Sequence, residues 1–376
     1  MRTTLLLKRA DILNEITAPL LTWYKSQARA LPWREEPTPY RVWISEIMLQ
    51  QTRVEAVRPY FERFTEILPD LHALASCPED QLMKLWEGLG YYTRARNLQK
   101  TAQLVLREYN GQLPADFEQL LQLPGIGRYT AGAIASIAYS QKAAAVDGNV
   151  LRVITRLITC PEDILKERTK RAVEAALLNI MPDGAEAGTF NQALMELGAT
   201  ICLPRGTARC PACPLHRLCL ACAENCIADF PKKTPPKARR IEKRTILLLS
   251  CQNKLAIQQR PARGLLAGLW EFPNLTGHFS RHALLELLQE KGFTAVSMEK
   301  LPPARHIFSH IEWHMQGWYI ELENHQIKEG QSSQYGNREN SFDSDSLYWI
   351  TRNELIKHYS IPTAFHHFFS KIRQEL

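Results

Sequence analysis

A stretch rich in proline and lysine, from Phe230 to Arg240, divides this chain of 376 residues into two parts of different character. Prolines at this density prevent a continuous helix, so the stretch is predicted to be a linker. Before it, apolar residues recur with helical spacing in segments of roughly 10 to 20 residues, separated by signals such as "LPDL" and "MPDGAEAG". After it come short β-type runs, "TILLLS", "KLAIQQR", "GWYIEL" and "LYWIT", and one helix, "RHALLELLQEKG". The sequence therefore predicts a helical domain followed by an α+β domain.

The positive charge is concentrated beside this linker. The formal net charge is +7, and "KKTPPKARRIEKR" alone carries seven basic residues and one acid, which leaves the rest of the chain near +1. Any surface for nucleic acid must therefore be local. No apolar run approaches the ~20 residues of a membrane span. The segment "MRTTLLLKRADILNE" meets charge too early for a signal peptide, so we expect a cytoplasmic protein with no targeting signal and no membrane partner.

Six of the nine cysteines lie between Cys202 and Cys226, which favours one local metal site over a disulfide framework. The four expected ligands, spaced C-x7-C-x2-C-x5-C, are Cys202, Cys210, Cys213 and Cys219. One tight loop of this kind can wrap a cubic cluster, so a [4Fe-4S] cluster is predicted, with zinc as the alternative. Cys222 and Cys226 remain, and Cys222 lies close enough in sequence to compete as a ligand.

Two further motifs combine glycine and acid with helix starts. In "LLQLPGIGRYTAG", Gly125 and Gly127 allow a tight turn whose N–H groups lie at a helix N-terminus, where a phosphate oxygen binds favourably. This is a helix-hairpin-helix signature, although alone it is also typical of a plain αα-hairpin. Downstream, Asp147 in "AVDGNVLRVITRL" precedes another helix, where an isolated acid is commonly only an N-cap.

An acid also lies inside an apolar pattern. The run 40–64 predicts one amphipathic helix, and Glu46 lies among its apolar residues, in "SEIMLQQTRV". Val42, Trp43 and Leu49 are three or four residues away, so they are expected to desolvate the carboxyl group. Desolvation raises its pKa and keeps a proton available for general acid catalysis.

Taken in order, "SEIMLQQT", "LPGIGRYTAG", "VDGNV" and the cysteine loop resemble the endonuclease III superfamily of base-excision DNA glycosylases. The double glutamine and the second domain narrow the resemblance to the adenine DNA glycosylase (MutY) family, from about Leu20 to Phe368. The resemblance implies a multi-domain protein: an all-α helix-hairpin-helix glycosylase core with an iron-sulfur loop, and a C-terminal α+β Nudix-like domain that recognises 8-oxoguanine. The implied boundaries are 1–226 for the helical domain, 227–243 for the basic linker and 244–376 for the Nudix-like domain. Within the helical domain, a six-helix module spans about 31–139, and the N-terminal helix joins about 140–226 in the cluster module.

The implied activity is hydrolysis of the N-glycosidic bond of adenine mispaired with 8-oxoguanine or guanine, in base excision repair. Glu46 would protonate the base, Asp147 would stay ionised beside the cationic sugar, and Asn149 would assist through a hydrogen bond. Tyr129 stands where superfamily members that also cut the backbone carry a lysine. Because tyrosine cannot form a Schiff base, the enzyme is expected to be monofunctional.

The resemblance also implies DNA contacts. The matching positions in the helical domain are Arg34, Gln50, Gln51, Thr52, Leu89, Tyr91, Gly125, Gly127 and Gln192. Of these, Gln51 would fill the space left by the flipped base, and Leu89 and Tyr91 would wedge the other strand. In "HIFSH", the contacts to 8-oxoguanine would be Phe308, Ser309 and His310.

Two departures from the family pattern accompany these matches. The first cysteine gap holds seven residues where the superfamily usually has six, a difference that a loop absorbs cheaply. The acidic signature of Nudix hydrolases is missing from "SRHALLELLQEKG", so the second domain is expected to read a base and not to hydrolyse a nucleotide.

The expected partner is duplex DNA with an A:8-oxoguanine or A:G mispair, bound by a monomer in a bacterial cytoplasm at the nucleoid. Other repair or replication proteins are possible further partners. Two alternatives remain at this point: a bifunctional endonuclease III-like lyase acting on oxidised pyrimidines, and a non-catalytic iron-sulfur protein that only binds DNA.

Overall fold

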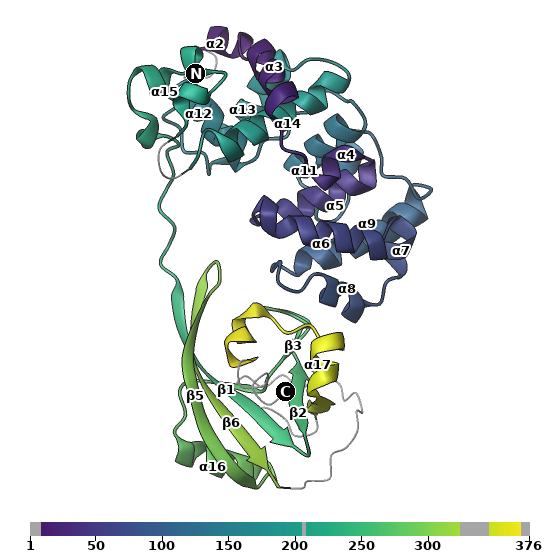
Figure 1. Ribbon diagram of the computed structural model, residues 1–376, viewed down its shortest axis with the longest axis vertical. Coiled ribbons are helices and arrows are strands. Elements are labelled where there is room, and N and C mark those ends of the chain that lie inside the picture. Colours follow the sequence, from purple (N-terminus) through teal and green to yellow (C-terminus); the bar gives the residue numbers. More distant parts are fainter. Residues whose placement is uncertain (1–8, 205–207, 324–345, 370–376) are drawn as a thin grey trace. The chain divides into compact units, whose positions relative to one another are not determined.

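The computed structural model describes residues 9–204, 208–323 and 346–369, and the chain forms two compact units (Figure 1). The first unit comprises Met1–Cys77 and Arg96–Pro235. The second comprises Pro78–Ala95 and Pro236–Leu376. The second unit therefore combines the strands of the C-terminal region with one helix and one loop from the middle of the helical region.

The first unit contains helices and no strand within the part of it that the structure describes. Its α-helices are α2 (Ala10–Asn14), α3 (Thr17–Gln27), α4 (Pro32–Glu35), α5 (Pro39–Leu49), α6 (Val54–Ile67), α7 (Leu71–Ser76), α10 (Phe117–Leu121), α11 (Arg128–Ala133), α12 (Gly148–Leu157), α13 (Glu167–Ile180), α14 (Ala185–Thr200) and α15 (Leu220–Ala223). Helix α9 (Thr93–Glu108) begins in the second unit and continues in the first. A π-helical turn, η1 (Ile134–Ala138), extends α11, and 3-10 turns are η2 (Cys210–Ala212), η3 (His216–Leu218) and η4 (Ile227–Asp229).

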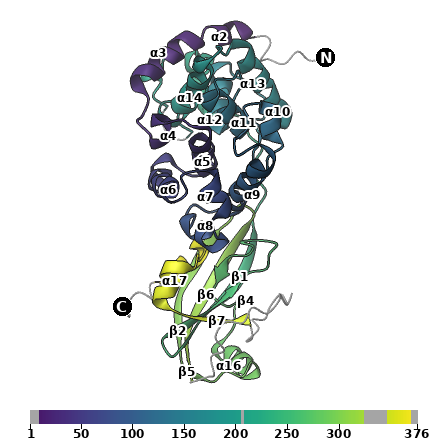
Figure 2. The ribbon, with the colours of Figure 1, turned by 90° about the vertical axis from the view of Figure 1, so that its right-hand side faces the viewer.

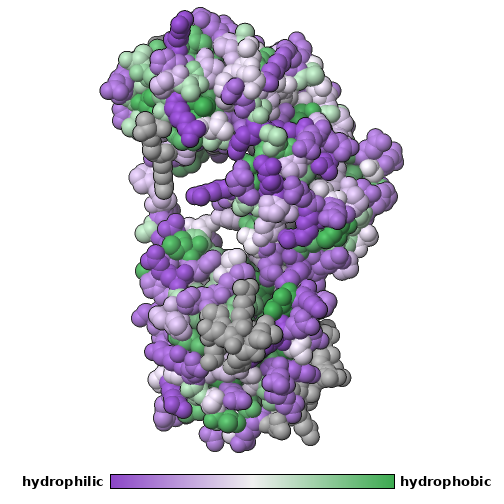
Figure 3. All heavy atoms as spheres, in the orientation of Figure 1, coloured by the Kyte–Doolittle hydropathy of each residue, from purple (hydrophilic) through white to green (hydrophobic). Residues whose placement is uncertain are grey.

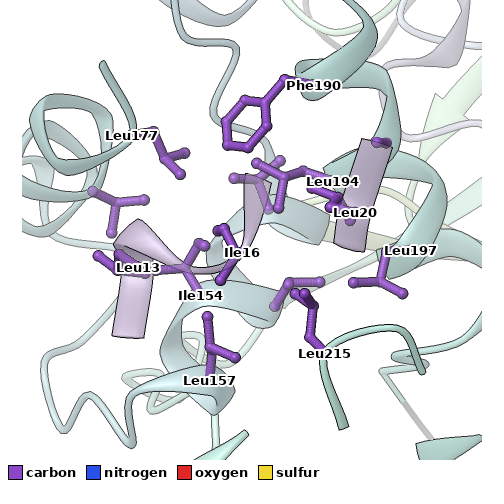
Figure 4. Packing of buried hydrophobic residues seen from close by; sticks show 14 of the residues in the cluster. Leu13, Ile16, Leu20, Ile154, Leu157, Leu177, Phe190, Leu194, Leu197 and Leu215 are labelled. Carbon is purple, nitrogen blue, oxygen red and sulfur yellow. The ribbon is translucent and has the colours of Figure 1, made fainter. Parts of the chain in front are cut away.

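A hydrophobic core joins α2 and α3 to α12, α13 and α14 (Figure 4). Phe190, Leu194 and Leu197 of α14 recur at helical spacing and are at most 1% exposed. Leu215, from the cysteine-rich loop, packs against the same core. Packing of this kind fixes α12 and α14 side by side and places the cysteine-rich loop next to them.

The predicted helix over residues 40–64 is wrong in one respect, because two helices replace it. Helix α5 ends at Leu49 and α6 begins at Val54, with Gln51 between them in the left-handed region at φ 61°. Such a conformation costs about 1–2 kcal/mol for a residue other than glycine. The polar letters "QQTR" supply no apolar side chain to hold a helical turn in the core. The spacing of apolar residues cannot reveal this break, because both helices bury their apolar faces in the same unit.

The second unit is built on one sheet. Its strands are β1 (Arg240–Cys251), β2 (Lys254–Gln259), β3 (Trp270–Glu271), β4 (Asn274–Thr276), β5 (Ala295–Ile307), β6 (Ile311–Leu322) and β7 (Tyr348–Thr351). The order is β3-β2-β1-β6-β5, with β4 paired to β1 and β7 paired to β2. Strands β1 and β6 are parallel, and the other pairs are antiparallel. The four predicted strand runs and the predicted helix are confirmed as β1, β2, β6, β7 and α16 (Arg281–Glu290).

Alternation along β1 gives the sheet two buried faces. Ile246 and Leu248 point into one core, which α17 (Arg352–His358) and η6 (Thr363–Phe368) cover. Leu247 and Leu249 point into the other core, which α16 covers (Figure 2). Both sides of the sheet are therefore occupied by the unit's own helices.

Helix α8 (Glu79–Leu85) is tied to the C-terminal segments of the same unit. The carboxylate of Glu87 accepts the Ile361 N–H at 2.9 Å and the Lys84 ammonium at 2.6 Å. Lys84 also donates to the carbonyl of Tyr359 at 3.1 Å. These bonds hold the loop that follows α8 in one orientation.

The molecule offers no feature of a membrane span within its described residues, where no helix is both long and apolar enough to cross a bilayer. Figure 3 shows hydrophilic side chains over most of the visible face of each unit.

Candidate active site

A cavity of about 150 Å³ opens in the first unit, between α4, α5, α11, α14 and the start of α12. Its walls bring together six residues singled out from the sequence: Arg34, Glu46, Tyr129, Asp147, Asn149 and Gln192. Thr52 also contributes to the wall. Residues more than a hundred positions apart in the chain thus share one small polar space.

Glu46 lies on α5 and is 6% exposed. The pKa of its carboxyl group is raised to about 7, mainly by burial and also by the negative charge of Asp147, while a hydrogen bond from the Tyr129 hydroxyl and the charge of Arg34 act in the opposite direction. That hydroxyl donates to Oε2 of Glu46. A carboxyl group in this state can carry a proton near neutral pH, as the sequence predicts.

Asp147 is the N-cap of α12, and it also faces the cavity. Its Oδ1 accepts the Val150 N–H at 2.7 Å, and its Oδ2 accepts from the Asn149 side-chain amide at 2.7 Å. Burial raises the pKa of Asp147, and these hydrogen bonds together with the charge of Arg152 oppose the rise. Asp147 therefore caps α12 and lines the cavity at the same time.

Gly198 of α14 was not singled out from the sequence, although it sets the position of Asn149. A Cβ atom at Gly198 would lie 2.6 Å from the Cβ of Asn149, a distance that real side chains do not tolerate. The buried Arg152 guanidinium donates to the carbonyl of Gly198, to Oδ1 of Asn149 and to the carbonyl of Cys202, each at 2.8 Å. This glycine and this arginine hold the start of α12 against α14 and against the cysteine-rich loop.

An ion-pair network at the cavity wall was also not predicted from the sequence. Glu196 is 1% exposed, and its two carboxylate oxygens accept from Arg29 at 2.6 Å and from Arg34 at 2.9 Å. Burial favours the neutral acid, but the two arginines outweigh it and lower the pKa of Glu196. The network orients the Arg34 guanidinium.

The spacing along α14 is the signal that would have revealed this wall. Gln192, Met195, Glu196 and Ala199 follow the i, i+3, i+4, i+7 pattern and all face the cavity. Gln192 is held by Tyr24, whose hydroxyl donates to Oε1 at 3.1 Å.

The two glutamines occupy the break between α5 and α6. Gln51 is exposed and left-handed, so its side chain leaves the helical path. The Gln50 amide reaches the hydroxyl of Thr130 at 3.5 Å. Thr52 is partly buried beside the cavity.

The predicted hairpin links α10 to α11. Gly125 is left-handed at φ 76°, and a Cβ atom there would come within 2.8 Å of the Asn97 Cβ atom. Gly127 is the N-cap of α11, so the turn ends at a helix N-terminus as the motif predicts.

In the second unit, the loop after α8 meets the turn between β5 and β6. Tyr91 is left-handed and 48% exposed, and its hydroxyl lies 2.9 Å from the Ser309 hydroxyl in hydrogen-bonding geometry. Leu89, by contrast, is 6% exposed. Phe308 packs its ring on Trp313 at a centroid distance of 4.9 Å. Phe308 therefore anchors the turn that presents Ser309.

His310 closes the same turn at the start of β6. Its carbonyl accepts the Arg240 N–H at 3.1 Å. The Phe308 N–H donates to the carbonyl of Ile311 at 2.8 Å, which closes the turn between the two strands.

A small cavity of about 30 Å³ in the cysteine-rich loop is lined by the four expected ligands and by Cys222. Arg156 donates to the Cys202 sulfur at 3.3 Å. Burial raises the pKa of the Cys213 thiol to about 12, although the Leu215 N–H acts against it. Within the described residues, no group of His, Cys, Asp or Glu lies close enough together to hold a single metal ion.

Comparison with known families matches both units. A model of the HhH-GPD superfamily of base excision DNA repair proteins matches residues 44–179, and a NUDIX domain model matches residues 244–371. The solved structure of a thermostable thymine-DNA glycosylase superposes with a TM-score of 0.50 at 28% identity, covering 58% of this chain and 98% of that one. The fold and the cavity therefore define a helix-hairpin-helix DNA glycosylase with a C-terminal Nudix domain.

Curated relatives identify the family more closely. The adenine DNA glycosylase of Mus musculus is 38% identical over 365 residues, covering 81% of this chain and 70% of the mouse protein. That of Homo sapiens is 37% identical over 372 residues, covering 82% and 68%. That of Buchnera aphidicola subsp. Schizaphis graminum is 34% identical over 301 residues, covering 79% and 84%. The chain belongs to the adenine DNA glycosylase (MutY) family and is an N-glycosylase that removes adenine from DNA.

Proposed function

We propose that this glycosylase removes adenine paired with 8-oxoguanine, or with guanine, by monofunctional hydrolysis in base excision repair. The observation that carries the proposal is the pair of carboxyl groups in one cavity: Glu46, whose pKa is raised to about 7, and Asp147 at the start of α12. One can hold a proton while the other stays ionised, which is the division of labour that cleavage of a glycosidic bond requires.

Glu46 acts first as a general acid. It donates its proton to N7 of adenine, and the electron pair of the glycosidic bond moves to the base, which leaves as a neutral molecule. Asp147 stabilises the positive charge that develops on the sugar, since its carboxylate faces the same cavity. Glu46, now ionised, accepts a proton from the water that attacks the sugar, so the acid is restored for the next turnover.

Tyr129 and Asn149 position these carboxyl groups. The Tyr129 hydroxyl donates to Glu46 and orients it, and the Asn149 amide donates to Asp147 at 2.7 Å. None of the described residues that line the cavity is a lysine, so no amine is offered for a Schiff base. This supports base removal without strand cleavage over the bifunctional alternative.

Arg34 and Gln192 are proposed to recognise the edge of the flipped adenine. Both line the cavity, and each is held by a second residue, Arg34 by Glu196 and Gln192 by Tyr24. A group that is already oriented loses little entropy when it binds the base.

Duplex DNA is the proposed partner of a monomeric enzyme. Gln51, exposed at the break after α5, is proposed to fill the gap left by the flipped base, with Gln50 and Thr52 supporting it. The turn that contains Gly125 and Gly127 is proposed to bind a backbone phosphate at the N-terminus of α11.

The second unit is proposed to recognise 8-oxoguanine. Exposed Tyr91 is the wedge residue, with buried Leu89 supporting its loop, and the Ser309 hydroxyl 2.9 Å from the Tyr91 hydroxyl is the group that contacts the lesion. Phe308 and His310, in the same turn as Ser309, are proposed as further contacts to the lesion. Each good hydrogen bond to a base edge provides about 1–3 kcal/mol of discrimination.

A [4Fe-4S] cluster is proposed on the four expected ligands, Cys202, Cys210, Cys213 and Cys219. The donor set fits, because four thiols line one cavity and the Arg156 guanidinium donates to the Cys202 sulfur at 3.3 Å. Zinc, which also binds four thiolates, is the alternative occupant of the same residues. The bound group would act as a structural crosslink, and Arg152 joins the Cys202 carbonyl to Asn149.

Single-turnover assays on matched duplexes test the proposal. We expect fast excision of adenine opposite 8-oxoguanine, slower excision opposite guanine, and no strand break until alkali or heat is applied. Preferred release of an oxidised pyrimidine, or a major complex trapped by borohydride, would establish the bifunctional alternative instead. Binding without release of any base would leave a DNA-binding protein only.

A further inference from the structure

Five cysteines line the small cavity of the cysteine-rich loop, although a [4Fe-4S] cluster takes four ligands. The fifth is Cys222, on α15, one helical turn after Cys219. Its N–H donates to the carbonyl of Cys219 at 3.2 Å and also approaches the Cys219 sulfur. Cys222 is thus part of the same folded turn as an expected ligand.

The side chain of Cys222 is paired with one particular ligand. Burial raises the pKa of the Cys210 thiol, and the neighbouring side chain of Cys222 raises it further. The same two residues also line a larger neighbouring cavity of about 720 Å³, whereas Cys202, Cys213 and Cys219 do not. Cys210 and Cys222 therefore share one edge of the small cavity.

The other three expected ligands are held by different groups. Arg156 donates to the Cys202 sulfur at 3.3 Å, the Leu215 N–H approaches the Cys213 sulfur, and the Cys222 N–H approaches the Cys219 sulfur. The neighbour of the Cys210 thiol is instead the side chain of Cys222, which lines both cavities with it. Replacement of one ligand by its neighbour is thus geometrically simplest at Cys210.

We propose that Cys222 is a reserve ligand, which binds the cluster in place of Cys210 when that thiolate is lost. The inference rests on the proposed [4Fe-4S] cluster. The exchange balances without any redox step, because one thiolate replaces another: Cys222 gives up a proton as it binds iron, and Cys210 takes up a proton when it leaves. The two C-x2-C pairs, Cys210 with Cys213 and Cys219 with Cys222, then provide two overlapping ligand sets.

Cys226 is the matched control. It lies four residues beyond Cys222 in the same segment, and its thiol approaches the Glu224 carboxylate at 3.8 Å. Neither cavity includes it among its lining residues. It therefore tests whether loss of any cysteine near α15 disturbs the loop.

The test is the iron and sulfide content of full-length protein purified anaerobically, with absorbance near ~400 nm. We expect Cys210→Ser to retain roughly half or more of the wild-type iron, and Cys213→Ser and the double variant Cys210→Ser/Cys222→Ser to retain roughly a tenth or less. Cys222→Ser and Cys226→Ser should retain full iron. Circular dichroism of each variant, and a second set with alanine in place of serine, distinguishes loss of the cluster from failure to fold.

Alkylation gives an independent measurement on the same samples. In the loaded wild type, iodoacetamide should label Cys222, and in Cys210→Ser the iron should protect it, as read by mass spectrometry of the peptides. Equal loss of iron in Cys210→Ser and Cys213→Ser overturns the reserve role, and so does loss of iron in Cys222→Ser alone. Wild-type protein without iron and sulfide would instead overturn the proposed cofactor.

Discussion

Two buried carboxyl groups, Glu46 of the first unit and Glu271 of the second, have different surroundings. In the first unit, Glu46 is 6% exposed, and the hydrogen bond that it accepts comes from the neutral hydroxyl of Tyr129. In the second unit, Glu271 is 3% exposed, and it accepts from the guanidinium of Arg260 and from Gln258 at 3.0 Å. Desolvation raises the pKa of Glu46 although the Tyr129 hydroxyl donates to it, whereas Arg260 forms an ion pair with Glu271.

Glu242 of the second unit, like Glu196 of the first, repeats the pattern of Glu271. Burial acts to raise its pKa, but hydrogen bonds from Arg244 and Arg240, together with the Trp313 N–H, outweigh burial and lower it. These acids on β1 and β3 are thus both paired with arginine. The comparison indicates that burial alone does not make a carboxyl group catalytic, because the nature of its partner decides.

The largest effect is expected at Glu46. Glu46→Gln keeps the size of the side chain and removes the transferable proton, so single-turnover excision should fall by about 10³-fold while duplex affinity stays within a few-fold. Quenched-flow excision and fluorescence anisotropy measure the two quantities. Near-normal excision by this variant would contradict the role of Glu46 as the acid.

The counterpart in the second unit is Glu271→Gln, which leaves Arg260 buried without its ion pair. We expect the free energy of unfolding to fall by about 3 kcal/mol. Excision opposite guanine, measured well below the melting temperature, should be unchanged. If Glu271→Gln had the same melting temperature as the wild type, the proposed structural role of Glu271, in contrast to the catalytic role of Glu46, would be wrong.

Gly198→Ala tests the positioning of the carboxylate at the start of α12. The added Cβ atom would lie 2.6 Å from the Asn149 Cβ atom, so α12 must shift away from α14. A displacement of about 1 Å near the chemistry can lower the rate by about 10²-fold. The matched control is Gly184→Ala, where a Cβ atom meets nothing within 4 Å, although its φ of 63° is itself unfavourable for alanine. Equal excision rates in the two variants would refute the argument from close packing.

The smallest expected effect is a displacement along the pH axis. The Tyr129 hydrogen bond lowers the pKa of Glu46, so Tyr129→Phe should raise that pKa. The alkaline limb of the excision rate should therefore move to higher pH, whatever the change in maximal rate. A limb that moves to lower pH would show that Tyr129 does not stabilise the ionised carboxylate.

The sequence predicted both domain types and most of their elements because hydrophobic periodicity is local. It did not predict β5, a strand of 13 residues, since its letters "KLPPAR" contain two prolines. Those prolines fall at the irregularity between Leu301 and Ala304, on a strand at the edge of the sheet, where a missing N–H is tolerated.

Part of the candidate active site could also be predicted from local sequence. Family motifs identified Glu46 and Asp147, which lie within short stretches of sequence. The ion pairs of Glu196 and the close contact at Gly198 depend on residues more than forty positions apart, which no local pattern encodes. Helical spacing from Gln192 would have indicated Glu196, but its partners required the fold.

The most direct test is the pH dependence of single-turnover adenine excision by the wild-type enzyme. Because Glu46 must be protonated to act and its pKa is raised to about 7, the rate should be high below that pH and should fall tenfold per pH unit well above it. As the pH is lowered, the rate should also fall, because the carboxylate of Asp147 must stay ionised. Since the pKa of Asp147 is raised, this fall should begin at a higher pH than the ordinary pKa of an aspartate would give. A rate that stays constant to pH 9 would contradict the claim that buried Glu46, paired with a neutral hydroxyl, supplies the proton.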